Sequence, residues 1–457
     1  MQSNFVSIDR DTPYLLPPSL QDWLPKEHLA RFVVDIAEQL DLRPIKNSYA
    51  GKGSKPYHPA MMVALLFYGY ATGVFSSRKL ERSTYDSVAF RYITANTHPD
   101  HDTIATFRKR FLPELSKLFV QILMIAKQME LLKLGNVSLD GTKIKANASK
   151  HRALSYGHAC KIEAQLKAEV SELLKKAETA DHADQVDGMS IPEELNRREK
   201  RLDAILNAKA QIEQRALNRY NKEQTEYNKK IAARAKKESE SGKKAPGKPP
   251  KPPTASPAAK DQINLTDKQS RIMPISGGGF EQSYNAQAAV DTLSKLIVTA
   301  HITQKPNDKQ ELLPTLYNLC SLPKSLGTPT AILADSGYYS EHNIKACEDK
   351  SITPFIAFNR QCHHQPVWER FKQPPPICAD ADLITKMKHR LKTAVGKAIY
   401  ALRKTTSEPV FGIIKAVMGF KGFLLRGKEA VSGEWTLACM AYNIKKMHSL
   451  LQQTKLN

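Results

Sequence analysis

Hydrophobic residues recur at helical spacing through the N-terminal third of the chain. Apolar positions between residues 20 and 40 lie on one helical face, and a second run over 59–73 opens with proline and closes with glycine. Proline suits the first turn of a helix and glycine its C-terminal end, so the second run predicts a complete helix. Further helices are expected over 76–85 and 103–111. Short helices joined by polar turns fit a helix-turn-helix-like DNA-binding domain, and they fit a helical bundle with a basic solvated face equally well.

The pattern changes to that of strands near residue 137. Val137 to Asp140 has the composition of a short strand, and Gly141 behind it allows a turn or a bulge. A hairpin connection over 291–294 would join the next two strands. The other elements alternate in type: strands are expected at 284–290, 295–303, 331–334 and 353–358, and helices at 309–319, 341–348 and through most of 383–451.

This order of elements predicts an α/β domain with a ribonuclease H-like fold, whose five-stranded mixed sheet carries helices. The first and fourth strands of that fold are neighbours. Residues 151–280 form a long insertion after the first strand, with two helices expected as an antiparallel hairpin. Its residues 231–260 are basic and proline-rich, which is typical of a flexible linker, either solvated or in contact with DNA. We therefore expect a helical N-terminal domain over 1–135, the α/β domain over 136–150 and 281–457, and the insertion between its two parts.

A large positive charge makes a polyanion the expected partner. The chain holds 68 Lys and Arg against 46 Asp and Glu, a formal net charge of +22. Each basic side chain that faces a phosphate releases condensed counterions, which favours nucleic acid over the alternatives of an acidic protein or a ribosome. No run of about 18 apolar residues indicates a transmembrane helix, and the polar N-terminus lacks the apolar core of a secretory signal. We therefore expect a cytoplasmic protein.

Two aspartates end strands that the expected fold makes neighbours. Asp140 closes the first strand and Asp335 the fourth, and a carboxylate on the helix after the fifth strand would complete a cluster. Such oxygen ligands hold pairs of divalent metal ions, which stabilise the attacking and leaving oxygens of a phosphodiester. One Asp beside a Gly is commonly a turn residue, so the inference depends on their joint position. Gly277–Gly279 lacks the Lys-Ser/Thr of a phosphate-binding loop and is interpreted as a hinge.

Four segments resemble those of a known family. They are Val137–Asn147 around the first Asp, Tyr284–Asp291 on the hairpin, Ala334–Tyr338 around the second Asp, and Tyr400–Lys415. In residues and order they resemble the bacterial insertion-sequence transposases of the Asp-Asp-Glu (DDE) type, whose Glu lies in a Tyr-Arg-Glu-Lys signature. Tyr57-His58-Pro59 is similar to part of the helical domain that precedes the catalytic one in these enzymes.

The resemblance implies roles for six residues. Three acids would be catalytic and would bind Mg²⁺ or Mn²⁺, two ions per active site: Asp140, Asp335 and Glu408. Three others would hold the phosphates and strand end of the transposon DNA: Tyr400, Arg403 and Lys415. The enzyme would cut at the terminal inverted repeats of the element and join the 3′-OH to target DNA. Because two ends must be paired, a homodimer on double-stranded DNA is expected.

The spacing around Glu408 departs from the family signature. Four residues rather than three separate Arg403 from Glu408, and Pro409 follows directly. Because a residue before proline is disfavoured in helical conformation, we expect a break before Glu408, with Pro409 near the first helical position. Lys415, seven residues after Glu408, would share its face of a regular α-helix.

Further basic residues are candidates for DNA contact. Arg108, Lys109 and Arg110 follow one another on the expected helix 103–111, and residues 381–428 hold eleven Lys or Arg against two acids. Such an excess fits a phosphate-binding surface around the site.

Two other functions fit the same residues. A ribonuclease H-like, structure-selective nuclease would cut DNA without joining it, and a transposase-derived DNA-binding protein would have lost the chemistry. The displaced spacing before Glu408 is the one feature that favours the latter. Glu429 and Glu434 are the fallback candidates for the third acid.

Overall fold

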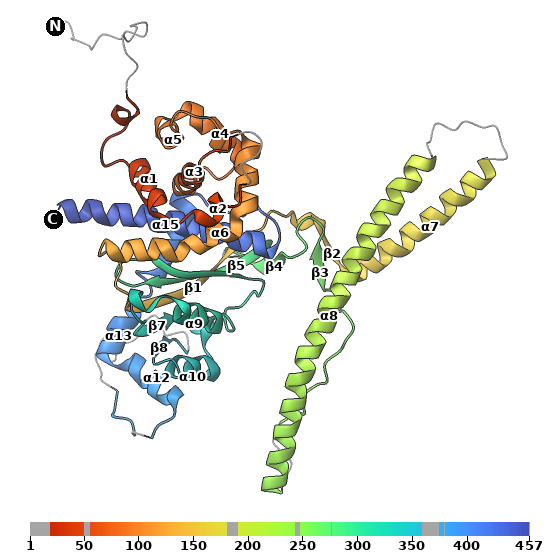
Figure 1. Cartoon of the computed structure of the whole chain (residues 1–457). Coiled ribbons are helices and arrows are strands. Elements are labelled where there is room, and N and C mark those ends of the chain that lie inside the picture. Colours follow the sequence, from red (N-terminus) through yellow and green to blue (C-terminus); the bar gives the residue numbers. More distant parts are fainter. Residues whose placement is uncertain are drawn as a thin grey trace, which may run out of the picture. The chain divides into compact units, whose positions relative to one another are not determined.

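The computed structural model describes residues 19–49, 55–180, 191–242, 247–275, 277–358, 374–378 and 380–456. The chain divides into two compact units. The first consists of Met1–Ile144 and Asn285–Asn457, and the second of Lys145–Tyr284. The N-terminal helices and most of the sheet therefore belong to one unit, and the insertion forms the other (Figure 1).

Helices fill the N-terminal part of the first unit. After the 3₁₀ turn Leu20–Asp22 they are α1 (Leu29–Gln39), α2 (Arg43–Lys46), α3 (Pro59–Thr72), α4 (Ser77–Asp86), α5 (Val88–Ile93) and α6 (His101–Gln128). As the sequence predicts, α3 begins at Pro59 and is closed by Gly73, its C-cap residue, whose φ of 86° is left-handed. The helix expected to stop at residue 111 instead runs on to Gln128, with Pro113 inside it. Among the described residues no single helix is long and apolar enough to cross a membrane. Helices α3 and α4 reach the necessary length and apolar character only when taken together, and the chain bends by 95° between them.

A mixed sheet forms the centre of the α/β part. Its strands are β1 (Asn136–Lys145), β4 (Arg271–Pro274), β5 (Phe280–Asp291), β6 (Ile297–Thr303), β7 (Ala331–Ala334) and β8 (Thr353–Ile356). The strand order is β4-β5-β1-β7-β8, with β6 paired to β5. β1 runs parallel to β7, and β7 parallel to β8, while β5 and β6 form the expected antiparallel hairpin. The sheet is consistent with a ribonuclease H-like domain, and its first and fourth predicted strands are neighbours.

Three details of the sheet differ from the prediction. β1 does not turn at Gly141 but continues to Lys145, because β5 pairs alongside it. β4 is an additional strand, antiparallel to the start of β5. Gly277–Gly279, all with positive φ, lie in the tight connection between these two strands and not in a hinge.

Helices cover the two faces of this sheet (Figure 1). The helices of this part of the chain are α9 (Leu312–Ser321), α10 (Glu341–Glu348), α12 (Leu383–Lys392), α13 (Ala394–Ala401), α14 (Ser407–Gly412), a π-helical turn (Ile413–Val417) and α15 (Lys428–Leu456). α15 contacts β6 as well as α3 and α6, and α10 and α12 contact β8. The fully buried Trp435 on α15 and Tyr70 on α3 lie in this core. The N-terminal helices thus pack directly on the last helix of the α/β part.

The second unit is a helical hairpin with a small sheet. Its elements are β2 (Ala153–Ser155), α7 (Tyr156–Ala180), α8 (Ile191–Ser241) and β3 (Gln262–Asn264). Ion pairs from Lys209 to Glu163 and from Arg198 to Glu169 fix α7 and α8 antiparallel. Their shared apolar core includes Leu166.

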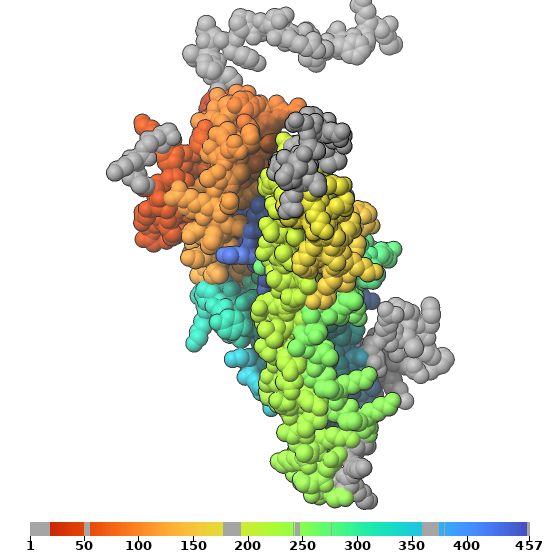
Figure 2. Space-filling view, turned by 90° about the vertical axis from the view of Figure 1, so that its right-hand side faces the viewer, coloured from red at the N-terminus to blue at the C-terminus, as the bar shows by residue number. Residues whose placement is uncertain are grey.

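The basic segment of this unit is more ordered than a flexible linker. Residues 231–241 continue α8. The described part of the proline-rich stretch then returns along the helix, where Arg234 donates to the carbonyl oxygens of Gly247 and Lys248. In Figure 2 it lies along the lower half of α8, and α7 lies along the upper half.

Candidate active site

The two aspartates lie at the same level of neighbouring strands. In the parallel pair, Ser138 of β1 is opposite Leu333 of β7, and each acid stands two residues further on. Asp335 follows β7 directly and caps the short turn after it, where its Oδ1 accepts a hydrogen bond of 2.8 Å from the Gly337 N–H. The chain therefore brings Asp140 and Asp335 together by strand pairing alone.

Glu408 comes from a separate helix that is tied to the same strand. The expected break is present: α13 ends at Ala401, residues 402–406 form turns, and α14 begins at Ser407. The buried Ser407 Oγ lies 3.2 Å from the Ser138 Oγ on β1. Glu408 itself is exposed on 56% of its side chain. This contact holds the start of α14 against the strand that carries Asp140.

Arg403 connects the first and third acids. Its Nη1 lies 3.7 Å from Asp140 Oδ2, and its Nη2 lies 3.4 Å from Glu408 Oε1. Only 15% of the Arg403 side chain is exposed, and its buried Nε has no hydrogen-bond partner. Asp140 and Glu408 are thus close enough to share one cation, despite the extra residue before Glu408.

Burial makes the Asp140 carboxyl unusual. The pKa of Asp140 is raised to about 6, chiefly by burial, with smaller upward contributions from the negative charges of Asp335 and Asp308. The Gly141 N–H and Arg403 act in the opposite direction. Grouped acids that are poorly solvated attract cations, because each is costly to ionise without a counter-charge.

Tyr400 and Lys415 border the acids from two sides. The Tyr400 hydroxyl donates a hydrogen bond of 3.4 Å to the carbonyl oxygen of Ala334, the residue directly before Asp335. Lys415 Nζ donates to Thr142 Oγ1 and to the Lys143 carbonyl oxygen on β1. Lys415 lies in the π-helical turn, so the regular α-helical spacing expected between Glu408 and Lys415 is absent. Burial lowers the pKa of Lys415, and the nearby Lys143 adds to this effect.

Of the three consecutive basic residues on α6, Arg108 is buried, and Lys109 and Arg110 are exposed. Arg108 is buried and donates to Tyr70 Oη at 3.2 Å and to the Phe75 carbonyl oxygen at 3.0 Å. The guanidinium faces the protein core, which disfavours the DNA contact expected of Arg108. Lys109 and Arg110 are exposed on the same helix.

The fallback acids lie elsewhere. Glu434 is fully buried, where it accepts hydrogen bonds from the Leu424 and Leu425 N–H groups and from Tyr70 Oη. Glu429 is exposed in the first turn of α15. Glu434 thus serves the core of the first unit, and Glu408 is the acid that shares Arg403 with Asp140.

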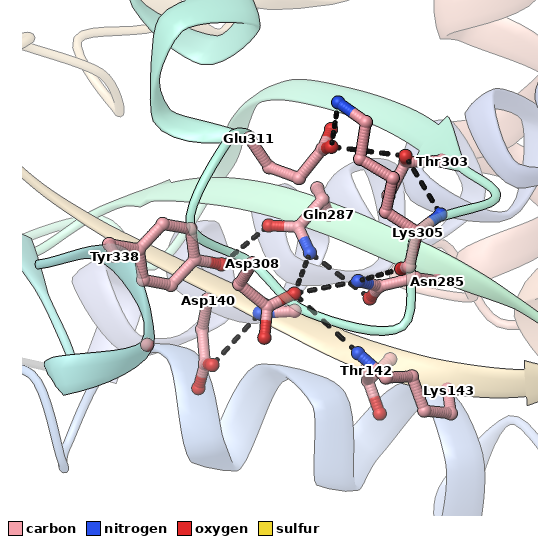
Figure 3. A network of polar contacts seen from close by, with 12 residues as sticks. Asp140, Thr142, Lys143, Asn285, Gln287, Thr303, Lys305, Asp308, Glu311 and Tyr338 are labelled. Carbon is pink, nitrogen blue, oxygen red and sulfur yellow. Dashed lines mark hydrogen bonds and ion pairs between the residues drawn. The ribbon is translucent and has the colours of Figure 1, made fainter. Parts of the chain in front are cut away.

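A polar network beside the site was not expected from the sequence (Figure 3). Asp308, in the loop after β6, accepts hydrogen bonds from the buried side-chain amides of Asn285 and Gln287 and pairs with Lys143. The sequence held one signal of it. Asn285 and Gln287 are two buried amides among the small and apolar residues of the stretch 284–290.

The donor set matches the chemistry of a hard divalent cation. Asp140, Asp335 and Glu408 offer carboxylate oxygens, the ligands that Mg²⁺ and Mn²⁺ prefer. The cation that two of them already share is the Arg403 guanidinium. As they stand, no three Cys, His, Asp or Glu side chains of the described residues are grouped as a metal site.

Two family models match the chain. Residues 18–110 match a transposase domain (DUF772), and residues 250–444 match a transposase DDE domain. The second match contains Asp335 and Glu408, whereas Asp140 lies before it. Comparisons with curated proteins and with solved structures found no match. With the two matches covering more than half of its length in the order helical domain, then DDE domain, the chain belongs to the insertion-sequence transposases of the DDE type.

Proposed function

We propose that this transposase cuts DNA at the ends of an insertion sequence and joins the freed 3′-OH to target DNA. Both steps would use one site, whose catalytic residues are Asp140, Asp335 and Glu408. The observation that carries the proposal is the position of Arg403, which pairs with Asp140 and with Glu408 at the end of the sheet where Asp335 follows β7. Acids from three distant segments thus meet in one region.

The same acids would hold two Mg²⁺ or Mn²⁺ ions. When bound, such ions lower the pKa of water and stabilise charge on the attacking and leaving oxygens. Asp140 is suited to this role because burial beside other acids disfavours its charged form until a cation compensates it. Asp335 has one oxygen engaged by the Gly337 N–H, which fixes the direction of the other.

The chemistry would be two similar phosphoryl transfers. Water attacks the phosphodiester at the element end, a new P–O bond forms, and the bond to the 3′-oxygen breaks to leave a 3′-OH. That hydroxyl then attacks a target phosphodiester in line, and the target's own 3′-oxygen leaves. Holding both strands in one site lowers the entropic cost of the second step.

Basic and hydroxyl groups would hold the DNA. Arg403 would exchange its carboxylate partners for a phosphate when metal and DNA bind, and Tyr400 and Lys415 would contact the strand end. We also propose that the helices of residues 1–135 bind the terminal repeats through Lys109 and Arg110, and that two copies pair the two ends. Residues 136–150 and 281–457 would form the catalytic domain.

Strand-transfer assays test this function against its alternatives. The first substrate is a labelled duplex that spans one end of the element, taken from the DNA that flanks the transposase gene. The second is the same duplex already cut to expose the 3′-OH of the element end. We expect the protein to cut the first and to join the second to plasmid DNA in Mg²⁺ or Mn²⁺. Cutting without joining would instead identify a nuclease. Binding without either step would identify a DNA-binding protein that has lost the chemistry.

A further inference from the structure

One oxygen of Asp308 is held by three donors. Its Oδ1 accepts hydrogen bonds from Asn285 Nδ2 at 2.6 Å and Gln287 Nε2 at 2.7 Å, and Lys143 Nζ lies 3.5 Å from it. Asn285 and Gln287 are on β5, and Lys143 is on β1, three residues after Asp140. The loop that carries Asp308 is thereby fixed to the two central strands of the sheet.

The two amides are themselves held in one orientation. Asn285 Nδ2 also donates to the Lys305 carbonyl oxygen at 3.1 Å, and Gln287 Oε1 accepts the hydroxyl proton of the buried Tyr338. Because each amide makes a further hydrogen bond besides the one to Asp308, its NH₂ group cannot turn away from Asp308 without breaking that other bond. Figure 3 shows this arrangement, with Asp140 at its edge.

The carboxylate of Asp308 also lies near the two glycines that follow the proposed catalytic aspartates, Gly141 after Asp140 and Gly337 after Asp335. A Cβ atom at Gly337, in the turn after Asp335, would lie 3.8 Å from Asp308 Oδ2. A Cβ atom at Gly141, next to Asp140, would lie 2.9 Å from Asp308 Oδ1. Asp308 therefore lies between the segments of the first and second acids. Glycine at 141 leaves the room that this close approach needs.

We propose that Asp308 is a positioning residue of the active site, which sets the spacing of Asp140 and Asp335 for a divalent cation. The inference rests on the proposed function. Oδ1 carries the structural part of the role, since it ties β1 and β5 to the loop. The charge of the carboxylate carries the electrostatic part, since Asp308 lies between the segments that hold Asp140 and Asp335. Residues that orient metal ligands in this way typically change metal affinity or activity about 10- to 100-fold when they are replaced.

Asp308→Asn separates the two parts of this role. The amide oxygen of Asn can still accept from Asn285 and Gln287 in place of Oδ1, but an NH₂ group then replaces Oδ2. Glu311→Gln is the matched control, because Glu311 is a buried acid of the same loop region that is bonded to Thr303, His301 and Lys305 and not to the aspartates. Each variant is made in the full chain.

The main readout is Mn²⁺ binding to the complex of protein and element-end duplex. It is measured from the electron paramagnetic resonance signal of free Mn²⁺, with the duplex alone as background. For Asp308→Asn we expect unchanged DNA affinity, about 10- to 100-fold weaker Mn²⁺ binding, and cleavage that recovers as Mn²⁺ is raised. For Glu311→Gln we expect a lower melting temperature with unchanged Mn²⁺ binding.

Other outcomes overturn the inference. Asp308→Asn with wild-type Mn²⁺ affinity and cleavage would show that Asp308 is not a positioning residue. If Asp308→Asn does not fold, Asn285→Ala, which loosens Asp308 and leaves every acid in place, must weaken Mn²⁺ binding in the same direction, and unchanged binding would contradict the proposal. Wild-type protein that neither binds Mn²⁺ nor cleaves would refute the proposed function itself, which is a distinct result.

Discussion

Ser138 Oγ lies 3.2 Å from Ser407 Oγ, although the two residues are 269 positions apart in the chain. Both are fully buried. Ser138 stands two residues before Asp140 on β1, and Ser407 stands directly before Glu408 on α14. This single hydrogen bond therefore couples the placement of the first proposed catalytic acid to that of the third.

Replacing either serine should loosen the site. Ser407→Ala leaves the Ser138 hydroxyl buried without this partner, which costs about 1–3 kcal/mol of unfolding free energy. The Ser138→Ala, Ser407→Ala double variant leaves neither hydroxyl behind and should lose less than the sum of the single variants. Thermal unfolding and end cleavage measure the two effects. Additive losses, with cleavage unchanged in all three variants, would mean that the contact does not position Glu408.

Arg403 should compete with metal for the acids. Arg403→Met removes the guanidinium that pairs with Asp140 and Glu408 and keeps most of the aliphatic stem. Without this counter-charge the acids repel each other, so the metal-free variant should melt below the wild type. Mn²⁺ should then raise its melting temperature by more than it raises that of the wild type. An equal or smaller rise in the variant would argue that Arg403 does not occupy the metal position.

Gly141 should tolerate no side chain. A Cβ there would lie 2.1 Å from Gln287 Nε2 and 2.9 Å from Asp308 Oδ1, both of which are fixed by hydrogen bonds. Gly141→Ala should therefore cost about 1–3 kcal/mol of stability and abolish cleavage. Gly412→Ala is the control on the helix of Glu408, since nothing lies within 4 Å of its Cβ, and it should stabilise the helix by about 0.5–1 kcal/mol. Equal melting temperatures for the two variants would refute the close approach.

Lys109 should contact phosphate, and Arg108 should not. Lys109→Ala is expected to weaken DNA binding and to lower the slope of log affinity against log salt by about one. Arg108→Met should lower the melting temperature, because it removes the buried bonds to Tyr70 and Phe75, and leave the salt slope unchanged. The affinities are measured on the same duplex at several salt concentrations. A salt slope that falls for Arg108→Met and not for Lys109→Ala would reverse this assignment.

The order of strands and helices was predictable because each element has a clear local pattern. β7 and α10 have the expected limits, since an apolar run followed by a capped polar helix leaves little choice. Strand order then brought Asp140 and Asp335 together. The end of β1 was not predictable, because Gly141 is a turn residue by composition and only its pairing with β5 extends the strand.

Local sequence patterns do not predict the role of a residue whose surroundings come from distant parts of the chain. Asp308 lies in a polar loop, and nothing local distinguishes it from a solvated residue until β5 supplies two amides. The run of three basic residues predicts Arg108 at the surface with Lys109 and Arg110, whereas its side chain is buried. Its spacing from Ile104 and Phe111 on α6 places it on the buried face of the helix. Helical periodicity therefore predicts the burial of Arg108 correctly, whereas its charge predicts exposure.

The most direct test of the proposed catalytic triad is end cleavage and strand transfer in Mg²⁺ or Mn²⁺ by four variants beside the wild type. They are Asp140→Asn, Asp335→Asn, Glu408→Gln and, as the control for the third acid, Glu429→Gln. We predict that each of the first three abolishes both steps and retains DNA-end binding, and that Glu429→Gln cuts and joins like the wild type. Wild-type cleavage by Glu408→Gln, or loss of cleavage in Glu429→Gln alone, would contradict the account.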